Sequence, residues 1–273
     1  MVRALVVAGL LCTHEASARA EAFTSLVDAG LLAAGSVSVG LFAPLRIGLT
    51  ERVELRAQAA SWAMLSPDVS VRIRHLDGDV RLSSHFGLWL PTPAMRLLKG
   101  TLFPSWETSS QNVGWFLVPS AGAALSVGRR AVFSARANLA VGLLPTGHND
   151  ARPLDTYAPI ELVFAPALNR FRASLHLSYD HAVLDWLRLR VDASLEGIGT
   201  PTPSRSPIYV AAGGAADFAL GRRWRLSAGF VWFNYDNRAQ ELVRDAQLGW
   251  QRVGVRSNDV YPTLDLVFLY EKK

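Results

Sequence analysis

Apolar and polar side chains alternate along most of the chain with the two-residue period of a β-strand. In the run Leu187–Gly197, leucine, valine and alanine alternate strictly with arginine, aspartate, serine and glutamate. The segment Val113–Leu144 contains two such runs joined by a turn at Gly128–Arg130. The runs exceed the about 5–6 residues of a typical soluble strand and approach the roughly 9–11 residues with which a tilted strand crosses a bilayer. The pattern therefore predicts strands with one face toward lipid.

The same alternation recurs in eleven segments whose connections differ in length. The segments are Ser36–Leu49, Val53–Ala59, Val69–Arg74, Val80–Leu90, Val113–Val127, Ala131–Leu144, Phe171–Asp180, Leu187–Gly197, Ile208–Leu220, Trp224–Tyr235 and Thr263–Tyr270. Short turns lie at Thr50–Arg52, Asp77–Asp79, Gly128–Arg130, Leu184–Trp186 and Gly221–Arg223, and longer links lie around 61–68, 91–112, 145–160, 199–207 and 236–259. A soluble sandwich also alternates, but short turns on one rim and long loops on the other are typical of transmembrane barrels. We predict an all-β fold, an antiparallel up-and-down transmembrane β-barrel.

Eleven strands cannot make up the whole barrel, because bacterial single-chain barrels have an even number of strands. A twelfth strand has to come from residues 23–34, from Ile160–Ala167, or from a division of Ser36–Leu49 at Pro44. We favour one of the first two sources. The prediction is about twelve strands, with ten to fourteen allowed.

Three motifs resemble those of Gram-negative outer-membrane β-barrel proteins. The run Gly48–Leu55, GLTERVEL, resembles their periplasmic hairpin of the form G-L-T-D-R-hydrophobic-E-L, and Val183–Leu189 resembles a second copy. The last strand, apolar at alternate positions through Tyr270, resembles their C-terminal assembly signal, although Glu271–Lys273 follow the final aromatic. The resemblance implies the outer membrane as location, and outer-membrane lipid and the barrel assembly machinery as partners. It implies no particular activity.

The N-terminus has the pattern of a secretory signal peptide. Arg3 precedes the apolar stretch Ala4–Leu11, and Ala18-Arg19-Ala20 provides a small-x-small cleavage site. We expect residues 1–20 to be removed near Ala20, leaving an N-terminal segment at 21–34, a candidate first strand, and the barrel at 35–273. A lipoprotein anchor at Cys12, the alternative, is disfavoured because Leu11 precedes it where a lipobox needs a small residue.

Composition excludes several classes of protein. Of the 273 residues, 50% are hydrophobic, which excludes a disordered chain, and no run of eighteen uncharged apolar residues predicts a spanning helix. The net charge is +5, but the basic residues are spread along the chain, so nothing predicts nucleic-acid binding. Cys12 is the only cysteine and the histidines lack metal-ligand spacing. We therefore expect no disulfide, metal or other cofactor.

The polar side chains at every second position of the strands are predicted to line the lumen. Aromatic residues near strand ends are predicted to form two membrane-interface belts. The candidate lumen residues, among which basic groups outnumber acidic ones, are Glu54, Arg56, Arg72, Arg74, Arg81, Arg136, Arg172, His176, Asp180, Arg188, Arg190, Asp192, Glu196, Asp217, Arg225 and Asp265. The candidate belt residues are Trp62, Trp89, Trp115, Trp186, Trp224, Tyr235 and Tyr270.

A barrel of about twelve strands allows several functions. We favour a narrow, porin-like passive channel for small polar or anionic solutes, because an arginine excess focuses anions. The alternative is a closed structural or surface-binding barrel with a salt-bridged lumen. A lipid hydrolase or protease is less favoured: Asp180-His181 and Gly147–Asp150 offer polar groups, but the Tyr-x-His-x-Ser-Asn-Gly pattern of outer-membrane phospholipases is absent. The long loop Pro91–Asn112 either folds inward as a constriction or lies on the outer surface.

Overall fold

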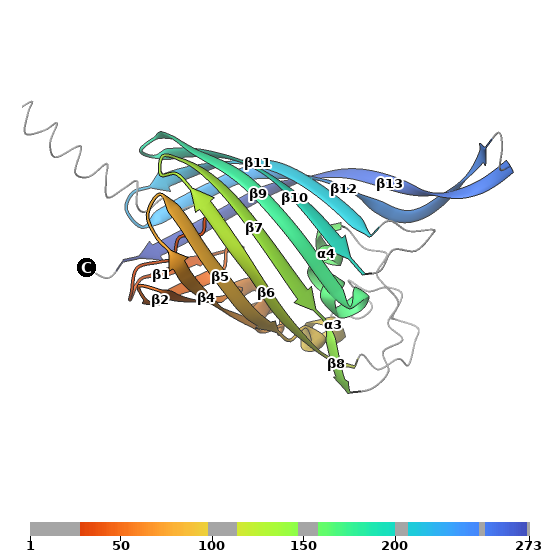
Figure 1. The fold of residues 1–273 in the computed structure, drawn as a ribbon, viewed down its shortest axis with the longest axis horizontal. Helices are drawn as coiled ribbons and strands as arrows, with labels where there is room; N and C mark the ends of the chain where they lie inside the picture. The colour runs from red at the N-terminus through yellow and green to blue at the C-terminus, as the bar shows by residue number, and fades with distance from the viewer. Residues whose placement is uncertain (1–27, 98–113, 147–157, 200–206, 246–248, 272–273) are drawn as a thin grey trace, which may run out of the picture.

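The computed structural model describes residues 28–97, 114–146, 158–199, 207–245 and 249–271, and its strands form a closed antiparallel barrel (Figure 1). Twelve strands make the ring: β1 (Val37–Gly40), β2 (Leu45–Thr50), β3 (Val53–Ala57), β4 (Asp68–Leu76), β5 (Val80–Trp89), β6 (Trp115–Val127), β7 (Ala131–Val141), β9 (Phe171–Leu184), β10 (Leu187–Ile198), β11 (Ile208–Leu220), β12 (Trp224–Asp245) and β13 (Gly249–Tyr270). Each strand pairs with the next, and β13 pairs with β1. The short β8 (Leu143–Thr146) pairs with β6 outside this order. The predicted barrel of about twelve strands is confirmed.

Side chains alternate across the barrel wall as the sequence pattern requires. On β10, Val191 is 58% exposed on the outer face, whereas Arg188 and Glu196 point inward and are buried. On β7, Phe133 is exposed and the adjacent Ser134 is fully buried. Apolar side chains thus cover the outside of the wall and polar ones line its inside, the inverse of a soluble protein.

The twelfth strand comes from the division at Pro44, so the two sources that we favoured are wrong. Residues 41–44 form a turn between β1 and β2, where proline, which lacks an N–H, cannot continue the ladder. Residues 160–167 lie in the helix α4 (Ala158–Asn169), because a short apolar run suits a buried helix as well as a strand. Residues 28–34, the described part of the other candidate, form no strand.

The predicted link 236–259 is not a loop. Strands β12 and β13 are 22 residues long and continue as a paired hairpin beyond the barrel, the part projecting farthest in Figure 1. Their pairing shifts register between Asp236 and Gln240 and then resumes to Asp245↔Gly249. Polar residues in this stretch hid the strands from the sequence pattern, since a hairpin outside the membrane needs no apolar face.

Two helices lie at the end of the barrel opposite the C-terminus (Figure 1). On α3 (Thr92–Leu97), Met95 packs with Phe116 and Val118 on the inner face of β6. On α4, Leu162 packs with Tyr209 on the inner face of β11. The start of the loop 91–112 therefore folds inward, and its residues 98–112 lie outside the described part. A third helix, α2 (Ala59–Ala63), follows β3. No helix within the described ranges is long and apolar enough to cross a membrane.

Candidate functional site

Residues 28–34, here called the lumen segment, lie inside the barrel. Asp28 and Ala29 are almost fully buried, and their backbone is bonded to the wall. The N–H of Ala29 donates to Ser126 Oγ at 2.8 Å, and Arg72 Nη2 donates to the carbonyl of Asp28 at 2.6 Å. These partners belong to β6 and β4. The segment is thus held against one side of the lumen, since β4 and β6 are separated only by β5.

An arginine cluster, comprising Arg46, Arg56, Arg72 and Arg136, lies beside the lumen segment. Arg46 binds both carboxylate oxygens of Glu54, at 2.9 and 2.7 Å, and Arg56 binds the same carboxylate. The Glu54 carboxylate also accepts the N–H of Leu32 at 2.7 Å. Glu54 is therefore the point at which β2, β3 and the lumen segment meet.

Positive charge in this cluster exceeds negative charge. Arg72 donates to neutral acceptors, namely Ser83 Oγ at 2.8 Å and the backbone carbonyls of Asp28 and Gly30. Among the described residues, Glu54 supplies the only carboxylate bonded to Arg46, Arg56 or Arg72. Arg136 adds a further positive charge within electrostatic reach. Buried charge that is not neutralised is costly, so the cluster favours an anion or ordered water.

The wall formed by β9–β12 has two tight ion pairs, Arg172 with Glu196 and Arg225 with Asp217, and between them charges that are held more loosely. Arg190 approaches Asp192 at 3.6 Å and Asp217 at 4.0 Å, beyond hydrogen-bond distance. Buried atoms with no hydrogen-bond partner among the described residues include His176 Nδ1, Ser178 Oγ and Arg188 Nε. Beside Arg190, Asp192 and Ser194 of β10, the paired inner positions of β11 are small: Ala215, Gly213 and Ala211. Small residues opposite unsatisfied polar groups leave room for water or a solute.

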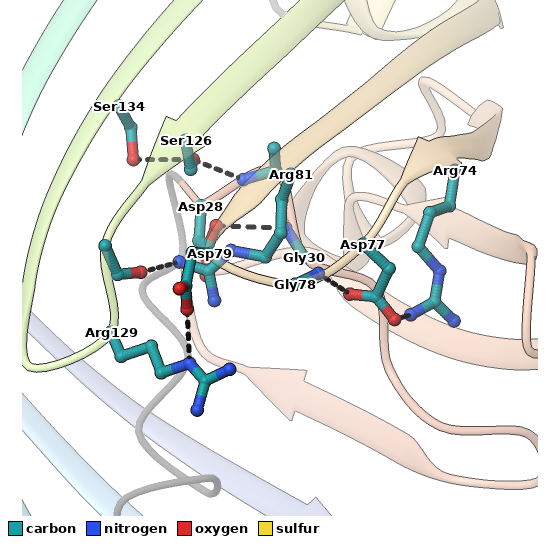
Figure 2. Close-up of polar contacts among 12 residues, drawn as sticks. Asp28, Gly30, Arg74, Asp77, Gly78, Asp79, Arg81, Ser126, Arg129 and Ser134 are labelled. Carbon is teal, nitrogen blue, oxygen red and sulfur yellow. Dashed lines mark hydrogen bonds and ion pairs between the residues drawn. The ribbon is translucent and has the colours of Figure 1, made fainter.

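A cavity of about 810 Å³ opens at the short-turn rim, between the lumen segment and the turns. Its lining includes five arginines, Arg74, Arg81, Arg129, Arg130 and Arg188, and four acidic residues, Asp28, Glu51, Asp77 and Asp185. Figure 2 shows three of the ion pairs here: Arg81 with Asp28 at 3.2 Å, Arg129 with Asp79 at 2.5 Å, and Arg74 with Asp77. Most of the charge on this rim is therefore internally paired.

The structure places the predicted lumen residues on the inner parity of their strands, with buried or half-buried side chains: Glu54, Arg56, Arg72, Arg74, Arg81, Arg136, Arg172, His176, Asp180, Arg188, Arg190, Asp192, Glu196, Asp217, Arg225 and Asp265. Three groupings appear among them. They are the arginine cluster with Glu54, the charges of the β9–β12 wall, and Arg172, which binds Glu196 at 2.8 and 3.0 Å and the carbonyl of Leu162 on α4. Arg74 and Arg81 lie at the short-turn rim, and Asp265 lies apart from all of these, near β1.

Two of the predicted belt residues do not face the membrane. Tyr235 is 9% exposed and stacks on Tyr209 inside the barrel, and Trp89 donates its Nε1–H to Ser66 and packs against Phe164. Both lie on the inner parity, so position near a strand end misled the assignment. The remaining candidates, Trp62, Trp115, Trp186, Trp224 and Tyr270, have exposed side chains.

Sequence reasoning missed two residues of the site. Arg46 is buried and central, and it carries the same alternation signal as the others, between Leu45 and Ile47. Treating Ser36–Leu49 as one strand obscured it. Asp28 carried no such signal, because the lumen segment has no strand period and its position depends on tertiary contacts.

The groups considered for catalysis and metal binding are not assembled into a site in the described part. The ring of His181 stacks on Tyr179, with 6.3 Å between centroids, and Gly147–Asp150 lies outside the described residues. Within the described ranges, no group of three or more histidine, cysteine or acidic side chains could hold a metal ion.

Comparisons with known proteins identify no family. No family model and no curated protein matches the sequence. Among solved structures, outer-membrane expressed OmpT of Vibrio cholerae is similar with a TM-score of 0.44 and 6% identity, over 83% of this chain and 64% of OmpT. A Pseudomonas aeruginosa FadL homologue is similar with a TM-score of 0.40 and 11% identity, over 86% of this chain and 68% of its own. The chain thus spans less than two thirds of the length of OmpT. Both TM-scores lie below 0.5, and the likenesses assign neither a family nor an activity to this chain.

Proposed function

We propose that this chain is an outer-membrane protein that acts as a narrow channel for small anionic or polar solutes. The observation that carries the proposal is the excess of arginine in the lumen, concentrated in the arginine cluster. Arg56 Nη2 in this cluster is buried and has no hydrogen-bond partner among the described residues. Fixed cationic groups in a low-dielectric channel raise the local concentration of anions.

The β9–β12 wall is the best candidate for the solute path. It joins the cavity at the short-turn rim, because Arg188 lines both. The loosely held Arg190 and the small side chains of β11 continue the path inward. The opposite wall is filled by the lumen segment. In this proposal a solute passes between the lumen segment and β10.

A second candidate function, a closed structural barrel, is supported by the same segment and by α4. The lumen segment is bonded to several strands, and α4 packs apolar residues against the inner wall. If these elements stay in place permanently, the lumen charges serve stability alone and no solute passes.

Single-channel conductance in a planar bilayer with a salt gradient separates the two functions. The channel predicts stable current steps with a reversal potential shifted toward the anion. Replacing both Arg188 and Arg190 with glutamate should move that potential toward the cation, whereas Arg52→Glu, an exposed change in the β2–β3 turn, should not. If protein that is strand-rich and shows heat-modifiable migration gives no current steps, the result would support the closed barrel. Unchanged selectivity in the double variant would contradict the assigned path.

A further inference from the structure

The barrel wall is short on one side. Strands β1, β2 and β3 have 4, 6 and 5 residues, which at about 3.3 Å per residue rise about 13–20 Å. The apolar band of an outer-membrane barrel is about 25 Å tall. The neighbouring β13 has 22 residues, yet it pairs with β1 only over Val267–Tyr270. No other strand in the described part of the chain pairs with that edge of β13.

The seam between β1 and β13 ends at the turn 41–44. There Leu41 N–H donates to the carbonyl of Leu266 at 3.2 Å, and the Asp265 carboxylate accepts the N–H groups of Phe42 and Ala43 at 3.0 and 2.8 Å. Above Asp265 this edge of β13 has no strand partner. In register, Leu264 lies beside Ala228, which lies beside Ala216 on β11. The wall therefore stops at a level where β11 and β12 continue.

Side-chain exposure marks the same place from both faces. The four most exposed large apolar side chains of the described residues flank it: Leu41 at 64%, Val260 at 63%, and Phe42 and Leu264 at 62%. Thr263 points inward by parity, yet it is exposed, whereas Tyr261 and Asp265 on the same face are half-buried. We call this opening, between β13 residues 260–264 and the turn 41–44, the lateral gap.

The surfaces behind the lateral gap are aromatic on one side and cationic on the other. Tyr261 packs edge-on against Phe233, and the Tyr235 hydroxyl, hydrogen-bonded to Asp259, leads to the apolar cluster around α4. Arg46 follows the turn 41–44 by two residues and is paired in register with Arg56. An anionic group just inside the gap would thus lie near the arginine cluster, and an apolar chain attached to it would find aromatic surface.

We propose that the lateral gap admits a single-chain amphiphile with an anionic head group from the membrane into the lumen. The head group binds Arg56, and the chain lies along Thr263 and the aromatic side chains of β12 and β13. A strand edge without a strand partner is costly in hydrocarbon, so this edge favours water or a polar group opposite it. This amphiphile is a specific class of solute for the proposed channel, and only its anionic head group rests on the proposed function.

Lateral access is tested with spin labels in lipid nanodiscs. In a Cys12→Ser background, a label at Thr263→Cys is compared with one at Ala215→Cys, which lies at the same level of the inner face through Gly229 but between complete strands. We expect lipid-dissolved oxygen to relax the Thr263 label several-fold more than the Ala215 label. Equal relaxation at both sites would overturn the gap, as would strong dipolar coupling between two Thr263 labels, which would mean that a second copy covers this edge.

Binding is tested with dansyl-undecanoate, using its uncharged methyl ester as control. We expect saturable fluorescence enhancement by the acid, about tenfold weaker binding in Arg56→Gln, and parent-like binding in Arg52→Gln. Thr263→Trp, which fills the gap on the inner face, should also weaken binding while leaving heat-modifiable migration unchanged. No binding by an anion-conducting barrel would overturn this inference and leave the channel standing. Binding by a silent barrel would support the gap and contradict the channel.

Discussion

The two walls of the lumen both carry arginine and carboxylate side chains, and they hold them differently. On the β2–β4 side, Arg46 and Arg72 are fixed by hydrogen bonds of 2.6–3.2 Å to Glu54, Ser83 and the lumen segment. On the β9–β12 side, Arg172 and Arg225 are ion-paired, but Arg190 stands 3.6 and 4.0 Å from its carboxylates. The difference arises from a segment with no regular structure, which supplies backbone acceptors to one wall only. Whether a charged side chain in the lumen stabilises the barrel or can contact a solute therefore depends on the groups that lie opposite it.

The largest expected effect on stability is on the β2–β4 wall, where hydrogen bonds fix the arginine side chains. Glu54→Gln leaves Arg46 and Arg56 without their carboxylate in a fully buried site, so we expect a loss of about 3–5 kcal/mol in the free energy of unfolding. Asp192→Asn is the matched change on the β9–β12 wall. It should cost clearly less, because the Asp192 carboxylate stands 3.6 Å from Arg190 and its side chain is 22% exposed. Denaturant unfolding in detergent measures both, and equal losses would remove the distinction between the walls.

A second prediction concerns how the lumen segment is held. Arg72→Met removes two charge-assisted hydrogen bonds to this segment, so the segment should leave its place more often. With Ala29→Cys in the Cys12→Ser background, we expect labelling by a water-soluble thiol reagent to be about tenfold faster. Arg190→Met, on the other wall, should leave the labelling rate at its parent value. Fast labelling in the parent protein itself would show that the segment is not fixed.

A third prediction addresses the space beside the small inner residues of the β9–β12 wall. Ala215→Leu adds volume at an inner position of β11, so conductance should fall several-fold if solutes pass there. Ala216→Leu, which adds the same volume on the lipid-facing side of the same strand, should leave conductance unchanged. A reduction by both variants would point to general distortion of the barrel.

The smallest effect is expected at the rim. Arg129 and Asp79 form an ion pair at 2.5 Å, but both side chains are more than two thirds exposed. Arg129→Ala should therefore change the free energy of unfolding by less than about 1 kcal/mol, measured as for Glu54→Gln. A larger loss would mean that this pair holds the β6–β7 turn in place.

The two-residue period was sufficient to predict the barrel, because in a membrane wall each side chain faces either lipid or lumen. It assigned Arg188 and Arg190 to the inner parity for that reason. It did not separate Trp89 and Tyr235 from the exposed aromatics, because apolar residues also occur inward where a helix fills the barrel. The period gave no signal for Asp28, and it suggested a strand at residues 160–167, which lie in α4. The position of both segments depends on contacts with residues far away in the sequence, which a local period does not encode.

The carboxylate of Asp265 also bears on how the barrel forms. Strands β1 and β13 are the first and last of the ring, so their seam brings together residues more than two hundred positions apart, Val37 and Tyr270. The backbone ladder of this seam is four residue pairs long, and Asp265 adds two hydrogen bonds at its open end. A non-local pairing is slow to form and a short one is easily broken. Ring closure is therefore expected as the last step of folding, and this seam as the line along which amide hydrogens exchange first.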